Sequence, residues 1–374
     1  MESIVGRQHV HQEILELTKD LIRIPSTRSR PRKIMDCAFF IEKWLQKYDI
    51  EYTRHSFNDV PVITVLPTQA HAPVLLMSHF DVVEADDESL FEPYIDNDRL
   101  YGRGAIDDKY GVAVSLILYR EHLRSLQQQG KSAGEMCFGL LFTGDEEVGG
   151  ANGAAVMAHK VTTDFFLAID GGRPELIVTK EKGVIELELN AHGIAAHSAR
   201  PWLGKSAFDV LVRDYLKMQE LFSLKTDDHW HKTMVLVKCN AGNGSSNIVP
   251  EQATALFDIR YTENDDPDAL IASIRGIVES TPTVRAQEPV FEAKPSPYLD
   301  LLVEFSEGAS VGFEHGASDA RHISQLGVPG AIWGADGEMS QHRGDEHIVI
   351  SSLTTLYDRL DGYFQHIQNG KLPR

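Results

Sequence analysis

Cysteine is scarce in this chain of 374 residues. The three present, Cys37, Cys137 and Cys239, are odd in number and lack a CxxC pair, so neither a disulfide framework nor a thiolate zinc site is indicated. Basic residues are also few, 36 against 55 acidic ones, and the formal net charge of -19 disfavours nucleic acid and anionic membranes as partners. No apolar run is long enough to span a membrane, and residues 1–19 lack the apolar stretch of a signal peptide. We therefore expect a cytoplasmic protein with reduced thiols.

What the chain does contain is an alternation of helical and strand-like patterns. Apolar spacing predicts a helix that ends before Pro25, a second around 39–45, a third over 111–126 with one apolar side, and a last over 353–367. Short apolar runs predict buried strands at 62–66, 74–77, 137–142, 165–169 and 331–333. This order is typical of an α/β sheet, and such open sheets bind ligands beyond the carboxyl ends of their strands.

The pattern changes between residues 181 and 292. A strand (184–190), a helix (207–222), two strands (234–239 and 253–261), a helix (267–279) and a last strand (284–291) follow one another. The order βαββαβ predicts a ferredoxin-like unit. We therefore expect residues 181–292 to be inserted into a discontinuous first domain made of residues 1–180 and 293–374, a division that the length of the chain permits.

Five candidate metal ligands are expected where strands end. They are two imidazoles and three carboxylates: His79, Asp107, Glu147, Asp170 and His342. Nitrogen and oxygen donors of this kind suit a pair of divalent ions such as zinc. In Ser78-His79-Phe80-Asp81, the carboxylate of Asp81 is expected to accept the second imidazole N–H of His79 and so fix its tautomer. Taken alone, this pair is more often a buried histidine satisfied by a neighbouring carboxylate.

The segment Gly102-Arg103-Gly104-Ala105-Ile106-Asp107-Asp108 has the glycine spacing of a dinucleotide-binding turn. However, Asp107 stands where the third glycine belongs, and Asp108 adds a second negative charge where a pyrophosphate would approach the helix N-terminus. A nucleotide-binding oxidoreductase is therefore the weaker interpretation. A carboxylate that bridges two cations is the stronger one.

The segment Gly144-Asp145-Glu146-Glu147-Val148-Gly149-Gly150 is the most specific motif. Neighbouring carboxylates of a strand point to opposite faces, so Glu146 and Glu147 reach one cavity only if the chain turns, as the glycines permit. Glu147 can then bind a metal while Glu146 remains free to take a proton, which makes Glu146 the candidate general base of a two-metal hydrolase. An acidic, solvated turn is the alternative, and a metal-binding protein without catalysis would not need Glu146.

Together these segments resemble the zinc-dependent exopeptidase and amidohydrolase family of acetylornithine deacetylase, succinyl-diaminopimelate desuccinylase, aminoacylase, dipeptidases and glutamate carboxypeptidase. The matching segments run from Ser78 to Glu346, and the order of elements matches over nearly the whole length. The resemblance implies a mixed, mostly parallel sheet flanked by helices, with an inserted domain that acts as lid and dimerisation domain. It implies that one ion is held by His79 and Asp170, the other by Glu147 and His342, and that Asp107 bridges them and is followed by a cis peptide bond.

The resemblance also assigns residues around the substrate. His197, in Gly193-Ile194-Ala195-Ala196-His197-Ser198, matches a histidine that crosses to the partner subunit and stabilises the oxyanion, so this role requires a homodimer. Asn247 and Arg260 match positions that bind the substrate carboxylate, for which a guanidinium is well shaped. Gly316 and Ser318 resemble a backbone loop that faces the same group. A surface ion pair is the alternative for Arg260.

The choice of substrate lies between two classes. Aspartate at position 170 resembles aminopeptidases and dipeptidases, whereas deacylases and carboxypeptidases more often carry glutamate there, which favours an exopeptidase. The overall length and the compact inserted domain resemble the deacetylase and desuccinylase group instead, so an N-acyl-amino-acid deacylase is the alternative. Both classes hydrolyse an amide near a free carboxylate, and the implied cofactors are two divalent ions: zinc, or else cobalt or manganese.

Overall fold

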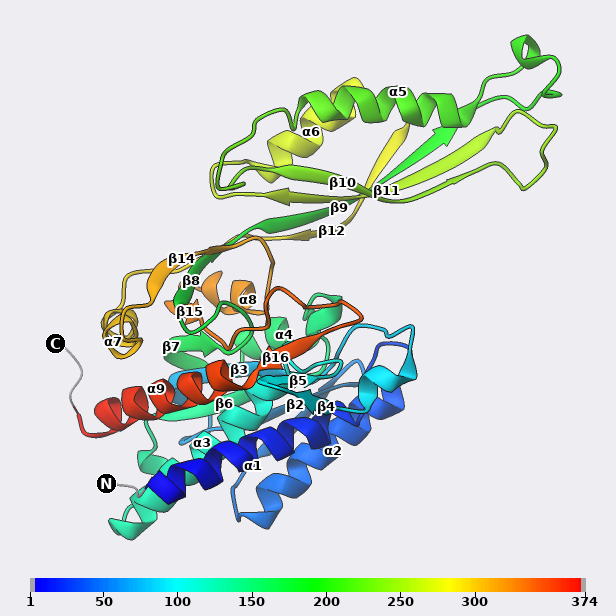
Figure 1. Cartoon of the computed structure of the whole chain (residues 1–374). Helices are drawn as coiled ribbons and strands as arrows, with labels where there is room; N and C mark the ends of the chain where they lie inside the picture. Colours follow the sequence, from blue (N-terminus) through cyan, green and yellow to red (C-terminus); the bar gives the residue numbers. More distant parts are fainter. Residues whose placement is uncertain (1–3, 371–374) are drawn as a thin grey trace. The chain divides into compact units, whose positions relative to one another are not determined.

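The computed structural model describes residues 4–370 and divides the chain into two compact units (Figure 1). The first unit comprises the chain up to Lys180, Ala293–Glu314, and the part from Ser318 onward. The second comprises Glu181–Glu292 and His315–Ala317. Within the described residues, no helix combines the length and the hydropathy needed to cross a bilayer.

The first unit is built on a sheet whose central strands are parallel. Its strands are β1 (Thr53–Phe57), β2 (Val60–Val65), β3 (His71–His79), β6 (Phe138–Thr143), β7 (Thr162–Ala168), β8 (Leu176–Glu181), β14 (Ser310–Glu314) and β15 (Gly330–Ile332). Their order is β1-β2-β6-β3-β7-β15-β8, with β14 also paired to β8. The neighbours β6, β3, β7 and β15 are parallel, whereas β2 and β8 pair antiparallel at either side.

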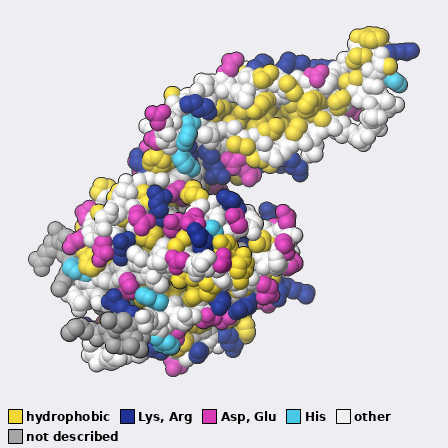
Figure 2. All heavy atoms as spheres, in the orientation of Figure 1, with side chains coloured by type: hydrophobic (Ala, Val, Ile, Leu, Met, Phe, Trp, Pro, Cys, Tyr) yellow, Lys and Arg dark blue, Asp and Glu magenta, His cyan; other side chains and the backbone are white. Residues whose placement is uncertain are grey.

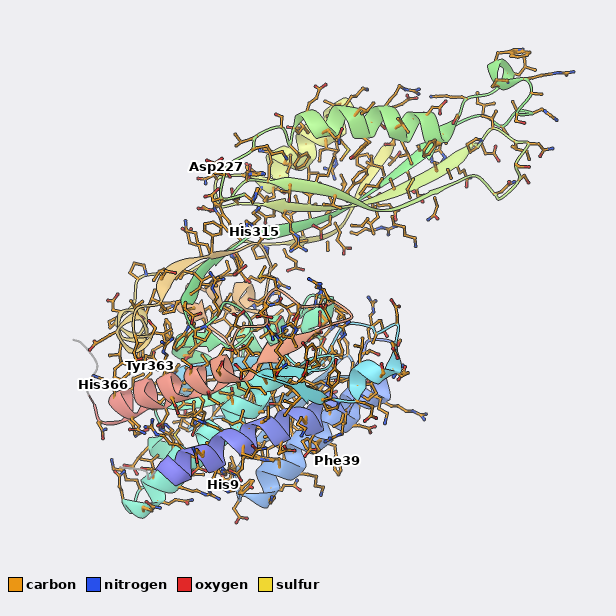
Figure 3. The ribbon with its side chains drawn as sticks, viewed as in Figure 1. His9, Phe39, Asp227, His315, Tyr363 and His366 are labelled. Atoms are coloured by element: carbon orange, nitrogen blue, oxygen red, sulfur yellow. The ribbon has the colours of Figure 1, made fainter. Side chains whose placement is uncertain are left out.

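Helices flank this sheet, so the predicted α/β class is confirmed (Figure 1). They are α1 (Ile4–Ile22), α2 (Pro31–Lys47), α3 (Lys109–Gln128), α4 (Ala154–Ala158), α7 (Pro297–Phe305), α8 (Ala320–Ser324) and α9 (Ile350–Gln368). Helix α3 packs on β3 and β6 and against α1 and α9, whereas α8 packs on β7 and β15. The outer helices keep an exposed face: His9 of α1 and Phe39 of α2 are exposed, while Tyr363 of α9 is buried (Figure 3).

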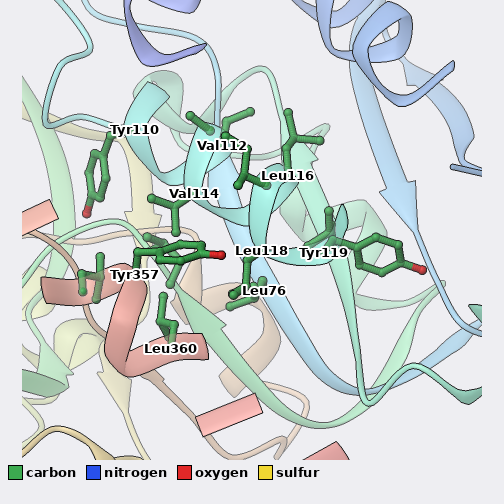
Figure 4. Close-up of a cluster of buried hydrophobic side chains, with 14 of the residues drawn as sticks. Leu76, Tyr110, Val112, Val114, Leu116, Leu118, Tyr119, Tyr357 and Leu360 are labelled. Carbon is green, nitrogen blue, oxygen red and sulfur yellow. The ribbon is translucent and has the colours of Figure 1, made fainter. Parts of the chain in front are cut away.

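Helix α3 differs from the sequence prediction in its burial. One apolar side was expected, but every residue from Lys109 to Arg120 is buried. The reason is that α3 lies in the middle of the core, with Leu76 of β3 and with Tyr357 and Leu360 of α9 around it (Figure 4). A helix that is buried all round is held by packing from every side. It therefore provides a rigid support for Asp107, which lies just before its first turn.

A small antiparallel sheet joins two distant segments of the first unit. Its strands are β4 (Tyr94–Asp96), β5 (Arg99–Tyr101) and β16 (His347–Val349), in the order β16-β5-β4. Short 3₁₀ turns complete the unit: η1 (Glu88–Phe91), η2 (Ala133–Glu135) and η3 (Glu146–Val148). Because β5 pairs with β16, the turn that follows β5 lies beside the loop that precedes β16.

The second unit has the predicted order βαββαβ. Its elements are β9 (Gly183–His192), η4 (Pro201–Leu203), α5 (Ala207–Glu220), β10 (Thr233–Ala241), β11 (Gln252–Tyr261), α6 (Pro267–Ile277) and β12 (Thr281–Glu288), followed by β13 (Phe291–Glu292). The sheet order β10-β11-β9-β12 is antiparallel throughout, as in a ferredoxin-like unit. Alternate residues of β9 and β11 are buried, and with α5 and α6 they form a separate core.

Candidate metal centre

Three parallel strands of the first unit end side by side. In the register of β3, His79 lies opposite Thr143 of β6, and Met77 lies opposite Ala168 of β7. Glu146 and Asp170 follow the ends of β6 and β7 within three residues. The carboxyl ends of these strands therefore bring His79, Glu146 and Asp170 to one edge of the sheet, where open α/β sheets bind ligands.

Two of the five expected ligands come from a different place than the sequence predicted. Asp107 lies in the turn before α3, and His342 lies in the loop before β16, so neither directly follows the end of a strand. They meet because β5 pairs with β16, with Tyr101 opposite His347. The five expected ligands do lie together, as predicted. Asp107 and His342, however, are brought there by the pairing of strands in the small sheet and not by the ends of strands.

Six side chains form two clusters of three. The first contains His79, Glu146 and Asp170, the second contains Asp107, Glu147 and His342, and within each cluster the potential ligand atoms lie within 4.8 Å of one another. Asp107 joins the clusters, because its Oδ1 lies 2.9 Å from Nε2 of His79 and its Oδ2 lies 3.0 Å from Nε2 of His342. A carboxylate with one oxygen toward each cluster has the arrangement of a ligand that bridges two ions. The site is therefore a candidate dinuclear metal centre.

The two adjacent glutamates reach different clusters because the chain turns at η3. Gly149 and Gly150 follow with φ angles of 97° and 65°, in the left-handed region that glycine adopts most readily. Oε2 of Glu147 lies 3.2 Å from Nε2 of His342, and Oε2 of Glu146 lies 3.9 Å from Nε2 of His79. Glu146 was expected to stand apart from any ion. The structure instead places it within the first cluster, although farther from His79 than Asp170, at 3.7 Å, or Asp107.

Asp81 supports the site in a different way than predicted. Its carboxylate was expected to accept the N–H of His79, but its backbone carbonyl is the nearer acceptor, 3.0 Å from Nδ1 against 3.4 Å for Oδ1. The carboxylate instead accepts the backbone N–H groups of Glu146 and Glu147, at 3.2 and 3.1 Å. Asp81 therefore holds the turn that separates the two glutamates, while its carbonyl leaves Nε2 of His79 to face the clusters.

The peptide bond between Asp107 and Asp108 is cis, as the resemblance implied. The buried carboxylate of Asp108 accepts the backbone N–H of His79 at 3.2 Å. The turn that carries Asp107 is therefore tied to the end of β3, which carries His79.

The carboxylates of the two clusters lie close together, so their negative charge has to be balanced by positive charge. Burial by itself lowers the pKa of His79, but Asp170, Asp107 and Asp81 together raise it well above 6.5. Hydrogen bonds to Asp107 and Glu147 raise the pKa of His342 to about 10. Burial raises the pKa of Glu147 to about 7 and that of Glu146 well above 4.5. In the metal-free protein, bound protons therefore compensate the negative charge of the crowded carboxylates. Divalent cations could replace these protons, because imidazole nitrogens and carboxylate oxygens are ligands that such cations bind.

The residues assigned to the substrate fall in different parts of the chain. His197 and Asn247 lie on neighbouring exposed segments of the second unit, where the carbonyl of Asn247 accepts the N–H of Ser198 at 2.9 Å. Gly316 belongs to the short stretch His315–Ala317 of the same unit, and Ser318 to the first unit. Their roles toward a substrate stay predictions.

Arg260, on β11, forms an ion pair, which was the alternative to a substrate-binding role. Its Nε and Nη2 donate to the two carboxylate oxygens of Asp258 at 2.8 and 3.0 Å. A guanidinium paired in this way is partly neutralised and keeps only its remaining N–H donors for a substrate carboxylate. This role of Arg260 likewise stays a prediction.

Three buried charged residues near the clusters were not singled out in the sequence. Asp319 accepts a hydrogen bond from Thr143 at 3.0 Å and lines a small cavity together with Glu146. Arg103 and Glu346 form a buried ion pair across 243 positions of the chain. In the sequence, only their positions next to candidate site residues could have pointed to them. Asp319 follows Ser318, Arg103 lies between two glycines, and Glu346 lies four residues after His342. A pairing over such a distance in sequence has no spacing pattern to reveal it.

The comparisons with known proteins agree with this geometry. Among curated proteins, a peptidase M20 domain-containing protein of Schizosaccharomyces pombe is 27% identical over 358 residues, which cover 94% of this chain and 83% of that protein. A succinyl-diaminopimelate desuccinylase of Rhodospirillum centenum is 30% identical over 308 residues, with coverage of 74% and 77%. Among solved structures, an M20 family metallo-carboxypeptidase from Sulfolobus solfataricus superposes with a TM-score of 0.77 at 18% identity, over 96% of this chain and 99% of that one. Residues 75–366 match the model of peptidase family M20/M25/M40, and because this match spans most of the sequence and contains both clusters, the chain belongs to that family.

Proposed function

We propose that this protein is a two-metal exopeptidase of the dipeptidase type, which hydrolyses an amide bond close to a free carboxylate. Family membership confirms the broader prediction of a hydrolase that acts on amide bonds. The observation that carries the finer proposal is the bridging position of Asp107, with Glu146 beside it at the first cluster. In this proposal, His79, Asp107 and Asp170 hold one ion, and Asp107, Glu147 and His342 hold the other, with zinc as the preferred metal.

Glu146 is the proposed general base. Two divalent ions, when bound, supply an acidified water and a polarised substrate carbonyl. The carboxylate of Glu146 accepts the proton of that water and later donates it to the departing amine. Two observations support this role: Oε2 of Glu146 lies 3.9 Å from Nε2 of His79, farther than the carboxylates of Asp107 and Asp170, and burial raises the pKa of Glu146 above its usual value of 4.5, which favours a group that can hold a proton.

A cavity beside His342 supports a substrate with a positively charged group. It has a volume of about 400 Å³, and its acidic lining includes Glu84, Asp86, Asp87 and Glu92. Its arginine, Arg103, is already neutralised by Glu346. An excess of carboxylates attracts an ammonium group and disfavours a further carboxylate. A peptide with a free amino terminus always offers such an ammonium group, whereas an N-acyl amino acid offers one only where its side chain carries an amine.

The alternative proposal is an N-acyl-amino-acid deacylase. The observation in its favour is the similarity to a desuccinylase over most of both chains. In either case the free carboxylate of the substrate is proposed to contact Asn247, Arg260, Gly316 and Ser318. The two proposals differ only in the group on the other side of the scissile amide, which makes them separable with paired substrates.

We also propose a homodimer formed through residues 181–292, the segment expected to serve as lid and dimerisation domain. Phe208, Val212 and Leu216 are exposed by 44%, 40% and 55% and lie four residues apart, so they form an apolar stripe on α5. Figure 2 shows hydrophobic side chains gathered over the visible face of this unit. Exposed apolar surface of this kind marks an interaction site, and a second copy of the chain would cover it.

The edge strand β10 supports the same proposal. Val235, Leu236 and Val237 are all exposed, although they are consecutive and point to both faces of the sheet. A long apolar edge strand is a template for pairing with another strand. In the resulting dimer, His197 is proposed to act in the site of the partner subunit, where it would stabilise the oxyanion.

The test is turnover, by the zinc-loaded protein, of a dipeptide and of the N-acetyl derivative of its C-terminal amino acid. Glu146→Gln is expected to lower kcat by about 10²- to 10⁴-fold while both ions remain bound, because only the proton acceptor is removed. Glu304→Gln, an exposed glutamate of α7, is the matched control and should leave kcat unchanged. An unchanged rate in Glu146→Gln with both ions bound would exclude Glu146 as the base. Faster hydrolysis of the N-acetyl derivative would select the deacylase.

A further inference from the structure

His342 lies on an exposed loop that the main sheet does not support. Its side chain is 55% exposed, whereas that of His79 is 2% exposed. Glu338, Met339 and His342 all have positive φ angles, of 52°, 58° and 63°, which non-glycine residues rarely adopt without support from their surroundings. The distances from His342 to Asp107 and Glu147 therefore depend on the groups that hold this loop.

A buried ion pair holds the end of the loop. The guanidinium of Arg103 donates to Oε2 of Glu346, and the two side chains are only 4% and 0% exposed. Oε1 of Glu346 accepts the backbone N–H of Gly104 at 2.8 Å, and its backbone carbonyl accepts that of Gly102 at 3.0 Å. Nη2 of Arg103 lies 3.4 Å from the carbonyl oxygen of His342 itself. One arginine thus contacts both the end of the loop and the backbone of the candidate ligand.

Arg103 stands on the segment that leads to Asp107. The turn from Gly102 to Asp107 ends on the buried helix α3, so it provides a fixed base for the contact. The ion pair therefore joins the segment that carries Asp107 to the loop that carries His342. By contrast, His79 and Asp170 are placed by the ends of β3 and β7 and do not depend on this loop.

We propose that Arg103 and Glu346 are positioning residues that set the affinity of the second metal position alone. This inference rests on the proposed function of the two clusters. Stabilisation of the fold is a weaker explanation for this buried ion pair, because the cost of removing two charges from water offsets most of the free energy of their attraction. A fixed geometry is a stronger reason, since the planar guanidinium fixes both the distance and the direction of the groups it contacts. Residues that orient ligands in this way commonly change metal affinity by about 10- to 100-fold when replaced.

The experiment uses the full chain, stripped with a chelator and titrated with Zn²⁺ by isothermal calorimetry, with bound zinc counted by elemental analysis. Glu346→Gln and the double variant Arg103→Met/Glu346→Leu are compared with the parent protein. The double variant leaves no buried charge unpaired, so it tests the tether without the cost of an isolated ion. The matched control is Arg343→Gln/Asp345→Asn, which removes an exposed ion pair of the same loop, 3.0 Å long and with side chains 62% and 59% exposed.

We expect both test variants to bind the first zinc ion with the affinity of the parent and the second about 10- to 100-fold more weakly. The control should bind both ions as the parent does. Unchanged binding of the second ion in the test variants would overturn the inference, and so would an equal weakening of both ions. A parent chain that binds fewer than two zinc ions would overturn the proposed dinuclear function itself, which separates the two failures.

Discussion

The two candidate metal-binding clusters of the first unit are held by different kinds of structure. In the first cluster, His79, Glu146 and Asp170 come from the ends of neighbouring parallel strands, and their side chains are 2%, 12% and 17% exposed. In the second, His342 comes from an irregular loop and its side chain is 55% exposed. Sites on regular elements are held more rigidly than sites on loops. We therefore infer that the first cluster is preorganised, and that the second would exchange a bound ion more readily with solvent.

The largest expected effect comes from removing the histidine of each cluster in turn. His79→Ala should lower kcat/KM by about 10³-fold or more, because an ion that contributes several kcal/mol to the transition state loses its buried imidazole. His342→Ala should be partly restored by excess Zn²⁺, since only the more accessible position is weakened. Activity and bound zinc are measured over a range of Zn²⁺ concentrations. Equal restoration of both variants would break the comparison between the clusters.

The next largest effect tests whether the two clusters bind metal independently of the second unit. Leu216→Glu places a charge in the apolar stripe of α5 and should convert the proposed dimer to a monomer, which light scattering after size exclusion measures directly. Activity should then fall by about 10²- to 10³-fold, as for loss of an oxyanion donor, while zinc content stays unchanged. His197→Ala should reproduce the loss of activity without loss of the dimer. Gln219→Glu, an exposed polar position of the same helix, is the control.

A dimer that persists in Leu216→Glu would reject α5 as the interface. Loss of zinc in that variant would contradict the assignment of both clusters to the first unit alone. Loss of zinc would change the comparison, because the second unit would then share in holding the metals.

The smallest expected effect is the release of protons when the two clusters bind zinc. In the metal-free protein, hydrogen bonds to Asp107 and Glu147 raise the pKa of His342 to about 10, so its imidazole holds a proton at pH 7, and the neighbouring carboxylates raise the pKa of His79 in the same direction. Since ligands must be deprotonated to bind, zinc affinity should rise with pH, and for the second cluster this rise continues to about pH 10. Calorimetry in buffers of different ionisation enthalpy should show that zinc binding releases protons, at least about one of them from His342. His342→Ala should release one fewer, and an unchanged count would contradict the raised pKa of His342.

Much of the architecture could be predicted from local patterns. The order βαββαβ of residues 181–292 followed from alternation and helical spacing, because β9, β11, α5 and α6 each have one buried and one exposed face. The placement of His79, Glu146 and Asp170 at one edge followed from strand ends, because parallel strands present their carboxyl ends together. The glycines after Glu147 predicted the turn that separates the two glutamates. In each case the physical cause acts over a few residues.

Other features could not be predicted because their cause lies far away in the sequence. The burial of α3 on all sides depends on α1 and α9, which its own apolar pattern does not reveal. Asp81 was correctly associated with the site, but the nearness of its carbonyl to His79 and the use of its carboxylate by the next turn depend on β3 lying beside β6.

The sequence by itself determined the chemistry of this protein, namely which side chains can bind divalent ions and that Glu146 adjoins a candidate ligand. Only the tertiary structure decided which donors share a cluster. Asp107 and His342 meet through the pairing of β5 with β16 and the buried contact of Arg103 with Glu346, whose partners lie 243 positions apart. Side-chain type is a local property, whereas proximity between distant segments is set by the packing of the whole unit.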